Sequence, residues 1–202
     1  MELTEGILQY RKKDFSGVDF SDLELCGYSF EECRFNGADF SRFSGKRCLF
    51  VHCDFSYAHM SGAEFDGCVL TGCLFRGASL FCVGLYECKA TGTSFDQANL
   101  AGLTIRRGNF SYASFAGCDL RKIDLQGVGL AHADLRRCNL RQAKLCGADL
   151  SHAMVQGTDF READLRDSLL SGADMKSAVL GKTRIDLPQA LVIAESMGCL
   201  FE

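Results

Sequence analysis

The chain lacks several residues that most folds use: its 202 residues include one proline and no tryptophan. With 21 glycines, this composition is unusual for a β-sandwich or an α/β enzyme. No stretch approaches the roughly 18 apolar residues of a membrane span, and the densest run is ALVIA at 190–194. The start, MELTEGILQYRKKDF, has no apolar core or cleavage site of a secretory signal. We therefore expect a soluble, cytoplasmic protein with no membrane partner.

A strong charge of either sign is also missing. The formal net charge is −4, from 22 Lys and Arg against 26 Asp and Glu. This balance favours neither direct binding to nucleic acid nor an acidic tail. No glycine-rich phosphate loop of the Walker or Rossmann type is present, and no nucleophile stands in a catalytic pattern. We expect no cofactor and no enzymatic activity.

What the sequence has instead is a period of five residues. In CNLRQAKLCGADLSHAMV, residues 138–155, an apolar residue returns at Leu140, Leu145, Leu150 and Val155. Of the 35 residue numbers divisible by five between 15 and 185, 34 carry an apolar residue, and Gly45 is the exception. A helix repeats every 3.6 residues and a strand every two, so the period belongs to a larger unit.

The repeat unit is a small residue, a polar residue, a large apolar residue and two mostly polar residues. It predicts a coil with four flat sides, so that about 20 residues close one turn and successive turns pair through their backbones at about 4.8 Å. The large residue, here called central, and the small residue two before it then point to a narrow axis. We expect a stacked ladder of Phe15, Phe35, Phe55, Phe75, Phe95 and Phe115. Gly45 leaves a gap in this pattern and predicts a kink.

These repeats resemble those of the pentapeptide repeat family, which implies an all-β fold, a right-handed quadrilateral β-helix. The resemblance covers residues 13–187 without a slip in register, so we expect a single domain with no large inserted loops. Residues 1–12 lack the repeat and are expected to form an N-terminal cap.

The segment RIDLPQALVIAESMGCLFE departs from the repeat and predicts a short C-terminal α-helix. Asp186 is suited to the N-cap, Pro188 to the first turn and Gly198 to the stop. We expect residues 188–202 to form this helix and a short strand. So short a helix is marginal alone, so it either caps the last coil or meets a second copy of the chain.

Cysteines and histidines are the candidates for metal chemistry. Eight of the 12 cysteines occupy the small inward position and no CxxC pair exists, which indicates small buried residues rather than zinc ligands. These eight are Cys33, Cys48, Cys53, Cys68, Cys73, Cys88, Cys118 and Cys138. His132 and His152 stand 20 residues apart near Asp134, so a metal or acid–base site remains an alternative to two solvated imidazoles.

Acidic residues supply the remaining signal, because 13 of the 26 directly precede a central apolar residue. They are predicted to project outward in rows, partly neutralised by arginines in neighbouring columns, as on an ordinary solvated surface. A stiff rod with spaced carboxylates also resembles duplex DNA, which carries one charge per about 1.7 Å of axis.

Within the family, the rod and its C-terminal segment resemble the Qnr and MfpA group. This resemblance implies a homodimer that binds type II topoisomerases, DNA gyrase and topoisomerase IV, and counters quinolones or natural gyrase poisons. The loop-free register is more similar to MfpA. The candidate partner-binding carboxylates are Asp119, Asp134, Asp159, Asp164 and Asp174, and the candidate dimer interface comprises Leu187, Leu191, Ala194, Met197, Leu200 and Phe201. The alternatives are a protein-interaction scaffold and, third, an enzyme.

Overall fold

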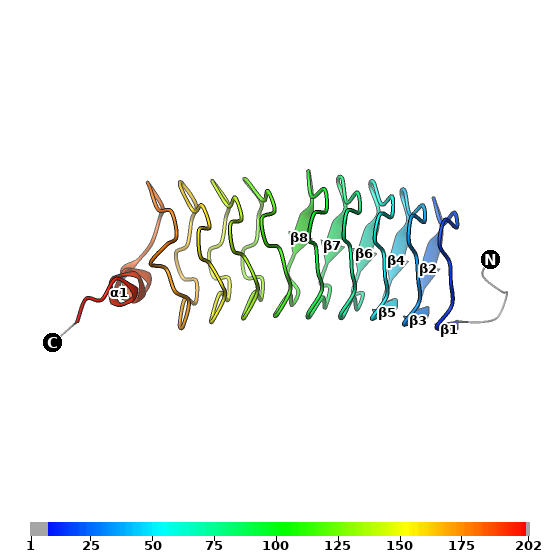
Figure 1. The fold of residues 1–202 in the computed structure, drawn as a ribbon, viewed down its shortest axis with the longest axis horizontal. Coiled ribbons are helices and arrows are strands. Elements are labelled where there is room, and N and C mark those ends of the chain that lie inside the picture. The colour runs from blue at the N-terminus through cyan, green and yellow to red at the C-terminus, as the bar shows by residue number, and fades with distance from the viewer. Residues whose placement is uncertain (1–7, 201–202) are drawn as a thin grey trace.

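A computed structural model describes residues 8–200 as a rod of stacked four-sided coils (Figure 1). The strands are only three residues long, because each fills one flat side of a coil. One sheet contains β1 (Gln9–Arg11), β3 (Ser29–Glu31) and β5 (Leu49–Val51). The other contains β2 (Glu24–Cys26), β4 (Ser44–Lys46), β6 (Glu64–Asp66), β7 (Gly84–Tyr86) and β8 (Thr104–Arg106).

All of these strand pairs are parallel, and each residue pairs with the residue 20 positions later. Single parallel bridges continue the same 20-residue step toward the C-terminus, as between Asp124 and Lys144. The fold is the expected right-handed quadrilateral β-helix. Strand β1 lies within the residues assigned above to the N-terminal cap, and its Tyr10 is buried as a central residue. Residues 1–7 lie outside the described part of the chain.

The central apolar residues fill the axis. The predicted phenylalanine ladder is confirmed: from Phe15 to Phe115, rings 20 residues apart stack with centroids 4.7–5.3 Å apart. All six of these side chains are at most 1% exposed. Stacking follows because identical side chains on neighbouring coils face the same way one strand spacing apart.

The eight inward cysteines are buried, as predicted. Their thiols reach backbone carbonyls of the preceding coil: Cys53 Sγ donates to Phe30 O (3.3 Å) and Cys73 Sγ to Phe50 O (3.2 Å). Thr158 uses its hydroxyl in the same way. Burial raises the pKa of Cys88 to about 11 and that of Cys118 to about 12, which keeps both thiols protonated and unreactive.

Gly45 does not kink the rod, and the prediction of an unfilled gap there is wrong. Gly45 lies in β4 and pairs with Leu25 on one side and Phe65 on the other. Phe43 occupies the small position of the same repeat, and a Cβ at residue 45 would lie 2.8 Å from Phe43 Cε1. The large and small residues have exchanged places, so the total volume is preserved.

The ladder of hydrogen bonds between coils opens on two adjacent sides between residues 97–107 and 116–126, and within residues 8–200 it is also interrupted on one side between Val155 and Asp174. Within the described residues, no bridge joins Asn99 to Asp119 or Thr104 to Asp124, although each pair is 20 apart. The other two sides of the same coils stay paired, as shown by Phe95 N–H donating to Ser114 O (2.9 Å). Figure 1 shows the coil that contains β8 standing apart from the next coil.

Helix α1 (Leu187–Ser196) closes the C-terminal end of the rod. Asp186 is its N-cap and Pro188 lies in its first turn, as predicted. Gln189 Nε2 donates to Ser168 O (2.7 Å), which ties the helix to the last coil. Cys199 and Leu200, expected to begin a strand, are in no strand, and Phe201 lies outside the described residues. No helix within residues 8–200 has the length and apolar character to cross a membrane.

Candidate functional site

The aspartates that precede the central residues have a local structural role. In each of the five candidates, Oδ1 accepts the backbone N–H of the residue two positions later, at 3.1 Å in both Asp134 and Asp174. This Asx-type contact stabilises the turn at the corner of the coil. The regular acidic position is therefore explained by the fold before any partner is considered.

Four of the five candidate carboxylates are also paired with arginines. Asp119, Asp134, Asp159 and Asp164 each bind the guanidinium of the residue two positions later, at 2.6–2.7 Å. The hydrogen bonds from these arginines lower the pKa of each carboxyl below its usual range. Asp174 is in no ion pair within the described residues and carries the free negative charge of the set.

The five carboxylates lie on three different sides of the rod. Asp119 and Asp159 share one side, with Asn139 between them. Asp134 stands on a second side, where Met154 follows it, and Asp174 stands one repeat of 20 further. Asp164 lies on the third. The structure therefore does not bring the five together into one continuous row.

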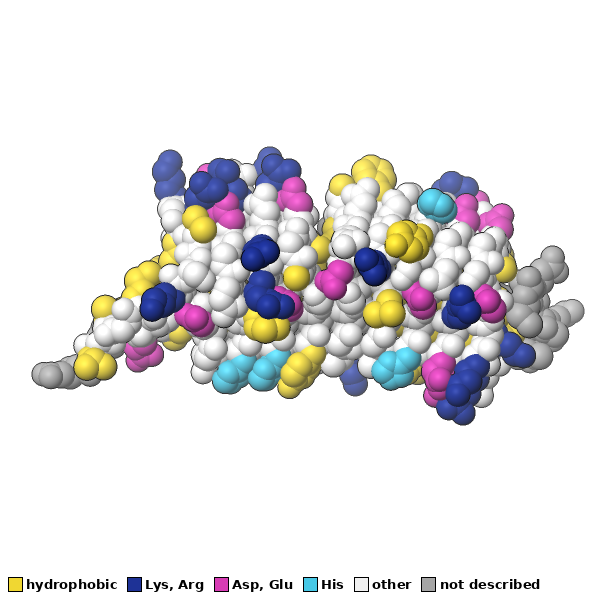
Figure 2. Space-filling model, viewed as in Figure 1, with side chains coloured by type: hydrophobic (Ala, Val, Ile, Leu, Met, Phe, Trp, Pro, Cys, Tyr) yellow, Lys and Arg dark blue, Asp and Glu magenta, His cyan; other side chains and the backbone are white. Residues whose placement is uncertain are grey.

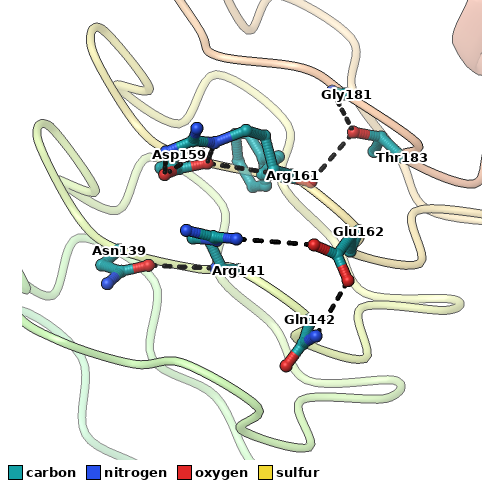
Figure 3. A network of polar contacts seen from close by, with 9 residues as sticks. Asn139, Arg141, Gln142, Asp159, Arg161, Glu162, Gly181 and Thr183 are labelled. Carbon is teal, nitrogen blue, oxygen red and sulfur yellow. Dashed lines mark hydrogen bonds and ion pairs between the residues drawn. The ribbon is translucent and has the colours of Figure 1, made fainter.

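A cross-coil polar network surrounds Asp159 (Figure 3). Arg161 holds Asp159, while Glu162 accepts hydrogen bonds from Arg141 (3.4 Å) and Gln142 (2.9 Å) of the preceding coil. Exposed pairs of this kind contribute about 0–1 kcal/mol each. The network neutralises this part of the surface.

Within residues 8–200, one backbone bridge that the sequence analysis did not single out joins two aspartates of neighbouring coils. Asp19 and Asp39 form a parallel bridge, and neither is in an ion pair within residues 8–200. The signal that reveals them is two aspartates spaced by 20 residues without an arginine two positions after either one.

The candidate dimer residues lie on and after α1, and several are exposed. Leu187 is 72% exposed, Met197 58% and Leu200 93%, while Leu191 is less exposed and Ala194 is half-buried. The opposite side of the helix packs on the last coil through Gln189 and Ile193. Figure 2 shows hydrophobic side chains gathered at this end of the rod. The helix thus caps the coil with one side and presents apolar surface with the other.

The structure places the two histidines of the alternative metal or acid–base site next to each other, but within the described residues it adds no further metal ligands. The rings of Tyr112, His132 and His152 stack in a column, with centroids 4.7 and 4.9 Å apart. Within the described chain, no group of three or more His, Cys, Asp or Glu side chains is placed to hold a metal ion.

Comparison with known proteins follows the same repeat. The family model for pentapeptide repeats matches residues 14–42, 123–161 and 158–185, and the model for the pentapeptide repeat region matches residues 58–135. No curated protein matches the chain by sequence.

Two structures of trypsin-treated QnrB1, a plasmid-mediated fluoroquinolone resistance protein, are similar to the whole chain. One is 26% identical with a TM-score of 0.84, and the match covers 96% of this chain and 98% of the trypsin-treated chain. The other is 25% identical with a TM-score of 0.82, covering 96% and 99%. HetL from the cyanobacterium Nostoc shares the fold at 22% identity and a TM-score of 0.54, covering 89% and 87%. The repeat, the family models and this full-length likeness show that the chain belongs to the pentapeptide repeat family and resembles Qnr proteins.

Proposed function

We propose that this protein is a non-enzymatic dimer that binds a bacterial type II topoisomerase and counters quinolones or natural gyrase poisons. The observation that carries the proposal is the likeness to a fluoroquinolone resistance protein along nearly the full length of both chains. A fold alone does not fix a function, so the surfaces that would contact the enzyme require separate arguments.

Dimerisation is supported by the exposed apolar side chains of the C-terminal segment. Burying a side chain such as Leu187, Met197 or Leu200 contributes about 1.5–3 kcal/mol. A two-fold contact between two such ends would use each residue twice. It would join two rods end to end into a longer particle.

Binding to the topoisomerase is assigned to the carboxylates of the C-terminal half. Asp174 is free of ion pairs, and the arginine-paired carboxylates are held by contacts worth about 0–1 kcal/mol. Basic side chains that normally grip DNA phosphates could replace these arginines as partners. The pairs would keep the free protein close to neutral and release charge on binding.

The second candidate is a protein-interaction scaffold for another partner, with a helix that only caps the rod. The observation in its favour is that four of the five candidate carboxylates are neutralised by arginine. A surface of paired charges resembles duplex DNA less closely than the sequence suggested.

A supercoiling assay with gyrase and with topoisomerase IV, with and without a quinolone, tests the proposal. We expect either rescue in the presence of the drug or inhibition in its absence. Asp174→Lys is expected to weaken the effect about tenfold. Asp149→Lys is the matched control, because Asp149 also accepts a turn N–H and lies on the fourth side. No effect on either enzyme would favour the scaffold.

Sedimentation equilibrium tests the dimer. Met197→Glu is expected to convert the dimer to a monomer, because it places a charge in the apolar contact. Leu74→Glu is the control, since Leu74 is 47% exposed on the body of the rod. A monomeric unmodified protein would contradict the proposed dimer.

A further inference from the structure

At the open level, within residues 8–200, the backbone N–H and C=O groups on two adjacent sides of the rod have no partner in the neighbouring coil. In closed coils these groups hydrogen-bond to the next coil, as Leu140 N–H does to Asp159 O (2.9 Å), and the break between Val155 and Asp174 is confined to one side of the rod. Within the described chain, no such bond spans the opening on two adjacent sides. The opening has two edges, here called lips, formed by residues 97–107 and by residues 116–126. On the first lip the unpaired donors are the N–H groups of Gln97, Leu100, Gly102, Ile105 and Arg107. On the second lip they are the N–H groups of Asp119 and Asp124.

Overfilling of the interior explains why the coils separate here. Leu103 and Ile123 occupy consecutive small positions of one column, where the following two coils have Ala143 and Ala163. Their central partners, Ile105 and Leu125, remain large. Extra volume in a packed interior forces the backbone apart.

The opposite side of the same level stays closed, so the opening is a wedge. Gly108 stands in the small position there, and Phe110 N–H donates to Gly129 O (2.7 Å). The bond from Gly129 N–H to Gly108 O (3.1 Å) is intact on this side.

The wedge opens to solvent as a groove of about 510 Å³ lined by residues 100–103 and 119–123. This volume lies within the range of ligand sites, about 300–1,000 Å³. Leu100, Leu103 and Ile123 are 6–8% exposed at its base, whereas Leu140 and Leu145 in closed coils are fully buried. The outline of the rod is notched at its upper edge (Figure 2).

We propose that this groove binds an extended peptide segment of a partner protein, inserted as a β-strand between the two lips. One lip presents mostly N–H donors and the other the facing carbonyls, so a peptide backbone satisfies both at once. Unpaired strand edges bind extended peptides in this way. The apolar base offers space for an apolar side chain of the peptide.

The two lips together form the rim of the groove, and the positive charge of this rim favours an acidic peptide. Residues 97–107 and 116–126 contain four basic side chains, Arg106, Arg107, Arg121 and Lys122, against two acidic ones, Asp119 and Asp124. The rim therefore carries a formal charge of +2. Lys122 is in no ion pair within residues 8–200, so it is available to a carboxylate of the peptide. This inference does not depend on topoisomerase binding.

Hydrogen exchange and fluorescence anisotropy test the groove with a defined probe, a labelled ten-residue peptide that repeats Ala-Asp-Leu-Glu-Glu. We expect the peptide to bind with a Kd of about 1–100 μM. It should slow amide exchange at Leu100, Gly102 and Ile105 at least tenfold and leave Leu140 and Leu145 unchanged. The same peptide with N-methylated amides should bind at least tenfold more weakly, because it cannot donate to the lip.

Two variants locate the site. The double substitution Arg106→Glu and Lys122→Glu should weaken peptide binding about tenfold, whereas Lys46→Glu with Lys176→Glu makes the same charge change elsewhere and should alter it less than twofold. Leu103→Ala with Ile123→Ala should close the wedge and abolish binding, while Val83→Ala should not.

Three results would overturn the proposal, and two of them need no variant. One is slow exchange at Leu100, Gly102 and Ile105 in the free protein, which would mean that the ladder is closed. Another is equal binding of the N-methylated peptide. The third is unchanged affinity after the wedge is closed.

Discussion

Phe43 and Leu103 belong to one column of the rod and are both large residues in a small position, with opposite outcomes. At Phe43 the central residue is Gly45, and the sheet continues through both without interruption. At Leu103 the central residue is Ile105, so both residues of the pair are large. The next coil also has two large residues, Ile123 and its central residue Leu125. There the ladder opens. At these two places the outcome follows the combined volume of the pair rather than the size of either residue alone.

The largest expected effect comes from breaking the compensated pair. Phe43→Ala leaves Gly45 beside a cavity and should cost about 3–5 kcal/mol of unfolding free energy. Urea denaturation measures this cost. Adding Gly45→Phe returns the repeat to its ordinary order and should recover most of the loss. If the double variant is no more stable than Phe43→Ala, the exchange of volumes does not explain Gly45.

The second prediction separates two kinds of glycine. Gly127 has a φ of +64° and open space around its Cα, so Gly127→Ala pays only for the left-handed backbone, about 1–2 kcal/mol. Gly45 has no positive φ, and its alanine variant meets the Phe43 ring. Combining Gly45→Ala with Phe43→Ala should therefore relieve the Gly45 penalty. The same second change should leave the Gly127 penalty unaltered in thermal denaturation.

The third prediction compares ion pairs at the wedge and away from it. The side chain of Asp119 is 53% exposed at the wedge, and that of Asp134 is 13% exposed in a closed coil. Asp134→Asn should cost about 1 kcal/mol at pH 7 and Asp119→Asn clearly less.

We expect low pH to remove this difference in unfolding free energy between the two asparagine variants. The arginine hydrogen bonds lower the folded-state pKa of both carboxyls, so their stabilisation is present above the unfolded value of about 3.9. It is lost as the pH falls through the lower folded value. Urea denaturation from pH 7 to pH 2 should show the two asparagine variants converging with the unmodified protein. A difference that persists at pH 2 would point to a cause other than ionisation.

The smallest expected change is at the uncompensated pair. Leu103→Ala loses apolar burial but returns the small position to its ordinary size, which allows the coils to re-form hydrogen bonds worth about 0.5–1.5 kcal/mol each. We expect these contributions to offset within about 1 kcal/mol in urea denaturation. A loss of 3 kcal/mol or more, typical of a tightly packed leucine, would show that the wedge is not overfilled.

The fold could be predicted almost entirely because every five-residue repeat carries the same pattern of small, polar and large apolar residues. The phenylalanine ladder and the buried cysteines follow from a spacing of 20 residues, and no long-range information is needed. The exchange at Phe43 and Gly45 does not follow from the pattern of central residues alone, because it depends on the volumes of two neighbouring positions together. The wedge was missed for the same reason, although Leu103 and Ile123 were visible as departures from the small position.

The site was less predictable, because the type of a residue does not determine which neighbouring side chain it binds. The spacing predicts that Asp164 projects outward, but the contact of its carboxylate with Arg166 at 2.6 Å is seen only in the structure. Helix α1 was predicted from Asp186, Pro188 and Gly198. Which of its sides would remain exposed depended on how the last coil received it, through Gln189 and Ser168.

The 20-residue register makes the rod a molecular ruler with uniform divisions. Removing or duplicating one coil would change its length by about 4.8 Å and leave every later side chain facing the same direction. A change of five residues would instead turn the rest of the rod by one side. Evolution can therefore adjust the reach of such a protein in whole coils without redesigning its surfaces, and helix α1 can keep its place on the last coil while the rod changes in length.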